Sequence, residues 1–123
     1  MRIAILEDDS AQLELLQCWI RDAGHTSEGF PTGQAFQNAV RRETYDLLIL
    51  DWNLPGLHPQ RLVRTLRECC PDAQLIAISV KPEHEKDAKE YGLDGFISKQ
   101  LSAESFIVLL KHILSGQNKE MEK

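Results

Sequence analysis

The chain has 123 residues, of which 42% are hydrophobic and 27% are charged, a balance typical of one globular domain with a sizeable core. Its formal net charge of -5 disfavours direct nucleic-acid binding, since phosphate backbones are held mainly by clustered Lys and Arg. It has neither a signal-peptide pattern nor an apolar run near the roughly 18 residues of a membrane helix, so we expect a cytoplasmic location without membrane contact.

The first half of the chain alternates short apolar runs with amphipathic stretches. Residues 3–6 are apolar at successive positions, which indicates a strand buried on both faces. Apolar positions at helical spacing follow and stop at Gly24, a residue suited to a left-handed helix cap. A weaker strand is expected at residues 25–30, Thr32 can cap a second helix, and residues 47–50 predict another buried strand.

The second half continues the same alternation. Pro59 can open a third helix, residues 75–78 predict a strand, residues 96–97 a weaker one, and Ser102 can cap a last helix. The helix expected between Glu83 and Tyr91 is nearly all polar and can bury little apolar area. A solvated helix of ordinary stability and a mobile helix are equally compatible with that composition.

Five strands alternating with five helices predict a single doubly wound α/β fold. Right-handed crossovers would place helices on both faces of a five-stranded parallel sheet, in three α/β/α layers. The strand order 2-1-3-4-5 is expected by analogy with flavodoxin-like sheets. The domain should cover residues 1–116, and residues 117–123 should form a tail or the start of a linker.

Cysteine and histidine give no sign of a disulfide or a zinc site. The cysteines are odd in number and two are adjacent, which is poor geometry for a disulfide, so we expect small buried side chains at Cys18, Cys69 and Cys70. The histidines never pair with Cys or Asp at zinc-site spacing. Solvated surface positions are expected for His25, His58, His84 and His112.

Polar side chains follow the apolar runs, where the parallel strands should end at one edge of the sheet. This set comprises Glu7-Asp8-Asp9, Asp51, Ser79 and Lys99. Two carboxylates about 4 Å apart repel by roughly 4 kcal/mol at an effective dielectric of 20, so converging carboxylates need a cation. Oxygen ligands without thiolate or imidazole favour Mg²⁺.

Each of these residues alone has an ordinary explanation. An acidic triplet is commonly a solvated turn with Asp9 or Ser10 capping the next helix, Asp51 could end a strand, Ser79 could be a strand-end hydroxyl, and an isolated Lys99 would lie on the surface. Their coincidence at one edge of the sheet favours a site over four separate explanations.

Four motifs carry a resemblance to a known family, in its order and at its spacing: Leu6-Glu7-Asp8-Asp9, Leu50-Asp51-Trp52-Asn53-Leu54-Pro55-Gly56, Ile78-Ser79 and Phe96-Ile97-Ser98-Lys99. The sequence resembles the receiver domains of two-component response regulators over residues 2–116. The resemblance implies that Asp51 is the phosphoacceptor. It also implies that Asp8, Asp51 and the backbone carbonyl of Asn53 ligate Mg²⁺, with Glu7 acting through water.

The resemblance also implies a conformational relay. Ser79 would hydrogen-bond a phosphoryl oxygen, Lys99 would neutralise charge, and Phe96 would turn inward as the switch aromatic. The fourth helix, last strand and last helix would form the readout face. The donor would be a histidine kinase or phosphotransfer protein, and the readout a C-terminal output domain or a homodimer. Such a domain is a signalling switch rather than a turnover enzyme.

Several residues depart from the family pattern. Gln100 stands where proline is usual, and a cis bond before a non-proline residue costs about 2.5–4 kcal/mol, so the Lys99–Gln100 bond should be trans. Val80 replaces alanine or glycine and should narrow access to Asp51. Lys81 could shield the acyl phosphate or reorient attacking water. Asn53, Val80 and Lys81 are thus the expected rate-tuning positions.

Two other functions remain open from the sequence. A pseudo-receiver would keep the fold as an interaction module without phosphorylation, but the intact carboxylates, Ser79 and Lys99 argue against it. A phosphatase of the haloacid dehalogenase type would use Asp51 as nucleophile, yet its motif wants a second Asp where Asn53 stands.

Overall fold

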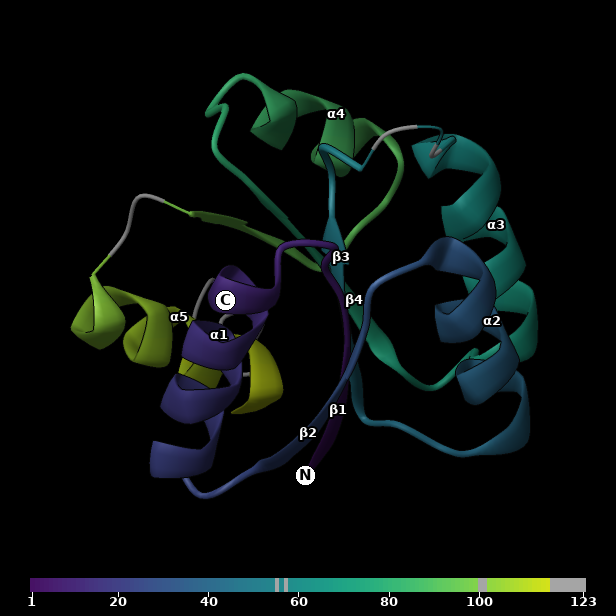
Figure 1. Cartoon of the computed structure of the whole chain (residues 1–123). Helices are drawn as coiled ribbons and strands as arrows, with labels where there is room; N and C mark the ends of the chain where they lie inside the picture. Colours follow the sequence, from purple (N-terminus) through teal and green to yellow (C-terminus); the bar gives the residue numbers. More distant parts are fainter. Residues whose placement is uncertain (55, 57, 100–101, 116–123) are drawn as a thin grey trace.

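The computed structural model describes residues 1–54, 56, 58–99 and 102–115. Within these residues, five strands alternate with five helices, as the sequence predicts (Figure 1). The strands are β1 (Arg2–Leu6), β2 (Thr26–Phe30), β3 (Leu47–Asp51), β4 (Gln74–Ser79) and β5 (Gly95–Ser98). The helices are α1 (Ser10–Asp22), α2 (Gly33–Arg42), α3 (Pro59–Cys69), α4 (His84–Glu90) and α5 (Ala103–Ser115).

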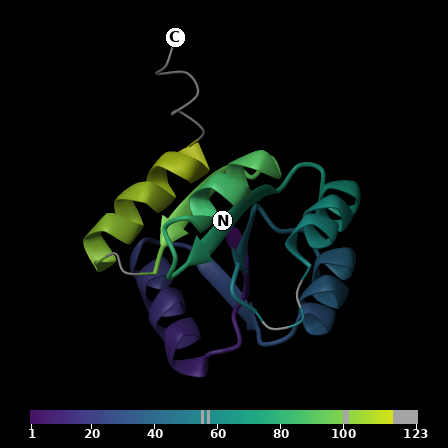
Figure 2. The ribbon, with the colours of Figure 1, turned by 90° about the horizontal axis from the view of Figure 1, so that it is seen from above.

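The strands form one parallel sheet in the order β2-β1-β3-β4-β5, which confirms the predicted order. Alternate strand residues point to opposite faces, and each face carries its own apolar cluster. One cluster joins the sheet to α2, α3 and α4, and the other joins it to α1 and α5. Figure 2 shows the sheet lying between these two groups of helices, so the three-layer arrangement is also confirmed.

The predicted helix ends are present in the structure. Asp9, Thr32 and Ser102 accept hydrogen bonds from N–H groups in the first turns of α1, α2 and α5. Pro59 is the first residue of α3. Gly24, which follows α1, has φ 92°, a left-handed conformation that glycine adopts without steric cost.

Helix α4 has fewer buried residues than the other helices that lie over the sheet. Its buried residue is Ala88, and Tyr91 just beyond its end is half-buried and contacts Trp52 with ring centroids 5.9 Å apart. The remaining α4 side chains are exposed or half-buried. This confirms the expectation that the segment buries little apolar area.

Expectations for individual cysteine and histidine side chains are wrong in part. All three are free thiols: Cys69 is exposed at the end of α3, while Cys18 on α1 and Cys70 just after α3 are half-buried. His25 and His84 are half-buried rather than solvated. His84 is the first residue of α4, where the chain returns close to the end of β4.

Two predictions fall on residues outside the described part of the chain. These are the tail at residues 117–123 and the trans bond between Lys99 and Gln100, so the domain boundary at residue 116 stays a prediction. In the part of the chain that the structure describes, no helix is both long enough and apolar enough to cross a membrane.

Candidate functional site

The register of the sheet brings the predicted polar residues to one edge. Leu6 pairs with Leu50, and Leu50 pairs with Ala77, so β1, β3 and β4 end at nearly the same level. Glu7 follows β1 directly, while Asp51 and Ser79 are the last residues of β3 and β4. These three residues, counted with their backbone, are 1%, 2% and 0% exposed, whereas the rest of the described core is apolar.

The acidic residues converge as the sequence predicts. Glu7, Asp8 and Asp51 each offer a carboxylate oxygen, and the three oxygens lie within 4.8 Å of one another. Asp8 is exposed, so the cluster opens to solvent on its side. Three converging carboxylates with one open side fit a hard cation such as Mg²⁺, which prefers oxygen ligands and retains water.

Asn53 closes the turn that follows β3. Its backbone N–H donates to Oδ1 of Asp51 at 3.0 Å. This hydrogen bond fixes one oxygen of the Asp51 carboxylate, and the other oxygen, Oδ2, faces Lys99. The two oxygens of Asp51 therefore have distinct surroundings.

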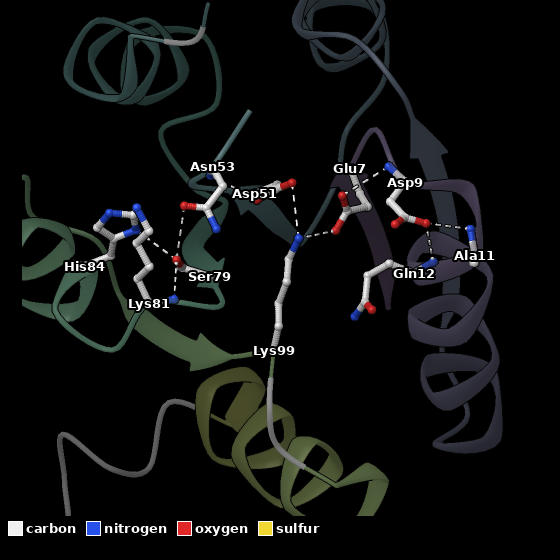
Figure 3. Close-up of polar contacts among 10 residues, drawn as sticks. All are labelled: Glu7, Asp9, Ala11, Gln12, Asp51, Asn53, Ser79, Lys81, His84 and Lys99. Carbon is white, nitrogen blue, oxygen red and sulfur yellow. Dashed lines mark hydrogen bonds and ion pairs between the residues drawn. The ribbon is translucent and has the colours of Figure 1, made fainter. Parts of the chain in front are cut away.

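Lys99 lies directly after β5 and bridges the two buried carboxylates (Figure 3). Its Nζ is 2.7 Å from Oε1 of Glu7 and 3.2 Å from Oδ2 of Asp51. Burial would lower the pKa of Lys99, but the hydrogen bond to Glu7 and the charge of Asp51 outweigh it and raise that pKa. Lys99 is therefore a fixed positive charge beside Asp51.

For Glu7, burial has a larger effect on the pKa than the ion pair with Lys99. Burial is the largest cause that raises the pKa of Glu7, the hydrogen bond from Lys99 lowers it, and the neighbouring Asp51 raises it, which together give a pKa of about 7. A carboxylate that is costly to ionise next to a second carboxylate is a feature of functional sites, where charges are held in place for an incoming cation or anion.

The hydroxyl of Ser79 has three polar neighbours (Figure 3). Its Oγ accepts a hydrogen bond from the backbone N–H of Lys81 at 3.0 Å, and Oδ1 of Asn53 lies 3.4 Å away. Nδ1 of His84 is nearer still, at 2.8 Å. The contact of His84 with Ser79 was not predicted, although the predicted helix begins at Glu83, four residues after Ser79, which indicates that its first turn could meet Ser79.

The other predicted residues lie outside the carboxylate cluster. Phe96 is half-buried on β5 and packs against the apolar cluster on the α2, α3 and α4 side of the sheet. Val80 is 45% exposed, and the side chain of Lys81 is exposed. Phe96, Val80 and Lys81 therefore do not belong to the carboxylate cluster, and their relay and rate-tuning roles stay predictions.

A cavity of about 600 Å³ opens beside the cluster. Asp8 lines it together with residues at the amino-terminal ends of α2 and α3, among them Thr32 and Arg61. Arg61 was missed from the sequence, because a single arginine on a helix carries no signal of its own. The cavity gives the acidic cluster an approach from solvent with a cation on its wall.

Residues 3–111 match the family described as the response regulator receiver domain. The chain belongs to this family. It is 32% identical over 117 residues to the phosphate regulon transcriptional regulatory protein PhoB of Pseudomonas aeruginosa, covering 91% of this chain and 51% of that protein. It is 26% identical over 113 residues to TorR of Escherichia coli, covering 91% of this chain and 49% of TorR. The receiver domain thus spans about half the length of these curated relatives.

Solved structures of receiver domains share the fold. A CheY-like receiver domain protein of Methanospirillum hungatei matches with a TM-score of 0.83 and 23% identity, covering 97% of each chain. TrrA of Thermotoga maritima, solved in complex with Mg²⁺ and BeF, matches with a TM-score of 0.81 and 21% identity over 91% of this chain and 97% of TrrA. Receiver domains are regulatory modules of two-component signalling rather than classical enzymes.

Proposed function

We propose that this receiver domain is a phosphorylation-dependent switch in which Asp51 accepts a phosphoryl group from a histidine kinase or a phosphotransfer protein. The observation that carries the proposal is the position of Asp51. It is a buried carboxylate of the acidic cluster and is paired with the ammonium of Lys99, with a buried hydroxyl on the adjacent strand.

The residues around Asp51 would have separate roles in phosphoryl transfer, namely metal binding and charge neutralisation. Asp8, Asp51 and the backbone carbonyl of Asn53 would hold Mg²⁺, with Glu7 acting through water, and the metal would neutralise charge on the incoming phosphoryl group. Lys99 supplies a positive charge close to Oδ2 of Asp51. Transfer of a phosphoryl group to a carboxylate depends on alignment and charge neutralisation more than on a strong base.

Ser79 and Phe96 would carry the signal outward. A hydrogen bond from Ser79 to a phosphoryl oxygen is charge-assisted and would contribute about 2 kcal/mol. Movement of Ser79 opens space on the adjacent strand that Phe96 can enter. A population shift of a few kcal/mol then suffices to change the surface formed by α4, β5 and α5.

That surface is the proposed contact for the next component of the pathway. In PhoB and TorR the part matched by this chain is about half of the protein, which supports readout by an output domain; a homodimer through the same surface is the alternative. The formal charge of -5 argues that any nucleic-acid contact belongs to that other component. The cytoplasmic location stays a prediction.

Incubation with Mg²⁺ and acetyl phosphate, followed by mass measurement of the intact protein, tests the proposal. Wild type should gain one phosphoryl group, EDTA should prevent it, and Asp51→Asn should gain none. A pseudo-receiver would remain unmodified. A phosphatase would release inorganic phosphate continuously without accumulating modified protein, and either result would contradict the proposal.

A further inference from the structure

The hydroxyl of Ser79 has one proton to donate and more than one candidate acceptor. A serine hydroxyl offers one O–H donor and two lone pairs, and the N–H of Lys81 already uses one lone pair. Nδ1 of His84 lies 2.8 Å from Oγ, and Oδ1 of Asn53 lies 3.4 Å away. The proton cannot be donated to both, so its direction decides what Ser79 can bind.

The distances favour donation to His84. Hydrogen bonds donated by a hydroxyl group to oxygen are about 2.5–3.0 Å long. The Ser79–His84 distance is of that length, whereas the Ser79–Asn53 distance is near the limit for any hydrogen bond. Donation from Ser79 to Nδ1 requires the tautomer of His84 that carries its proton on Nε2, and the inference below uses that tautomer.

Figure 3 shows Ser79 lying between His84 and Asp51 in that view. A proton directed to His84 is unavailable to an oxygen bound at Asp51. In the unphosphorylated protein, His84 thus competes with the phosphoryl group for the only proton of Ser79.

We propose that His84 is a positioning residue that holds the Ser79 hydroxyl away from Asp51 until phosphorylation, and that the exchange of this hydrogen bond releases the amino-terminal end of α4. The inference rests on the proposed function of Asp51 and adds a regulatory contact to it. It identifies the first event that links Asp51 chemistry to helix α4.

The construction of α4 makes this release effective. His84 is the first residue of a seven-residue helix, and the preceding Glu83 provides no side-chain cap for it. Ala88 is the buried residue of α4, so little apolar area opposes a shift of the helix. Loss of the Ser79–His84 hydrogen bond therefore removes a side-chain contact that holds the first turn of α4 against the end of β4.

Affinity for beryllofluoride in the presence of Mg²⁺ measures the competition, because beryllofluoride mimics a phosphoryl group. Trp52 follows Asp51 directly and its ring contacts that of Tyr91 just after α4, so its fluorescence provides a binding signal. His84→Leu removes the competing acceptor and should bind beryllofluoride about two- to tenfold more tightly than wild type, the factor expected for one hydrogen bond. His84→Asn, whose amide can reach the position of Nδ1, should stay close to wild type.

A double-mutant cycle shows whether the effect passes through Ser79. In a Ser79→Ala background there is no proton to compete for, so His84→Leu should then change the affinity by less than about twofold. His25→Leu removes a half-buried imidazole at the opposite edge of the sheet and should leave the affinity unchanged. If His84→Leu has the same effect with and without Ser79, it acts on packing and the inference is overturned.

Ring nitrogen resonances of His84 provide a readout that does not depend on a substitution folding well. The Nδ1 resonance should move when beryllofluoride and Mg²⁺ are added to wild type, because Ser79 turns its proton away, and it should not move in Ser79→Ala. A wild-type protein that binds beryllofluoride with no change at His84 overturns this inference alone. A wild-type protein that neither binds beryllofluoride nor becomes phosphorylated overturns the proposed function as well.

Discussion

The two edges of the sheet carry similar charged groups in different surroundings. At the amino-terminal edge, Arg2 bonds Glu28 at 2.7 Å and Glu43 at 2.8 Å, and these side chains are 43%, 47% and 49% exposed. At the carboxyl-terminal edge, Lys99 contacts Glu7 and Asp51 at 2.7 and 3.2 Å, and these side chains are 13%, 0% and 3% exposed. The distances are alike, and burial is what differs.

Burial changes what an ion pair contributes. Exposed pairs are screened by water and add little to stability. Burying ions costs desolvation that their mutual attraction only partly offsets, so buried clusters are retained where they serve a function. The charges at the carboxyl-terminal edge are therefore held at a cost in free energy, and removing any one of them should have larger effects than removing a charge at the amino-terminal edge.

The largest difference between the edges should appear in metal-dependent phosphorylation. Asp8→Asn removes a carboxylate from the Glu7, Asp8 and Asp51 cluster and should abolish Mg²⁺-dependent modification by acetyl phosphate. Glu28→Gln, which removes an acid at the opposite edge, should leave both Mg²⁺ affinity and phosphorylation unchanged. An unaltered Mg²⁺ affinity in Asp8→Asn would mean that the cluster has been misinterpreted.

Removal of the cation of each ion-pair cluster should lower the free energy of unfolding by different amounts at the two edges. Lys99→Met leaves two buried carboxylates without their cation and should lower the free energy of unfolding of the metal-free protein by about 3 kcal/mol. Mg²⁺ should restore part of the loss. Arg2→Met should lower the free energy of unfolding by much less, because its ion pairs are exposed. Equal changes in the two variants, measured by urea denaturation, would remove the distinction between the edges.

The raised pKa of Glu7 predicts a pH dependence in metal-free protein. That pKa is raised from 4.5 to about 7, mainly by burial and further by Asp51, so the stability associated with protonated Glu7 is complete below pH 4.5 and is lost as pH rises through 7. Glu7→Gln removes the titration. Its stability relative to wild type should therefore be greater at pH 8 than at pH 5, by on the order of 2 kcal/mol. A pH-independent difference in EDTA would contradict the raised pKa.

The smallest expected effect concerns access to Asp51. If the methyl groups of Val80 limit approach, Val80→Ala should be phosphorylated by acetyl phosphate a few times faster than wild type. Val108→Ala, which shortens another exposed valine on α5, is a matched control and should react at the wild-type rate. An equal or slower rate for Val80→Ala would exclude steric access as its contribution.

The amino-acid sequence is sufficient to predict the sheet and the membership of the site. Continuous apolar runs identify buried strands locally, and parallel strands must end at a common edge. The polar residues that follow the runs are therefore predictable as neighbours from their positions in the chain: Glu7, Asp51, Ser79 and Lys99. Caps at Thr32 and Gly24 are predictable because they depend on neighbouring backbone.

The contacts between these residues are not predictable in the same way. The bridge from Lys99 to both carboxylates depends on the path of a long side chain, which spacing does not determine. The Ser79–His84 bond depends on the residues between β4 and α4, where the chain turns back toward the sheet. A half-buried histidine at a helix start has the same sequence context as an ordinary surface residue, which is why the solvated position predicted for His84 is wrong.

Hydrogen exchange in the presence and absence of beryllofluoride and Mg²⁺ tests the central claim most directly. In wild type, exchange should change over residues 80–99, where Ser79, α4 and β5 meet, and stay constant in the first residues of β2 and in the residues before β3, at the opposite edge. In Ser79→Ala the change over residues 80–99 should disappear although Asp51 is still occupied. The same change in Ser79→Ala, or an equal change at both edges of the sheet, would contradict a relay that starts at the buried carboxyl-terminal edge.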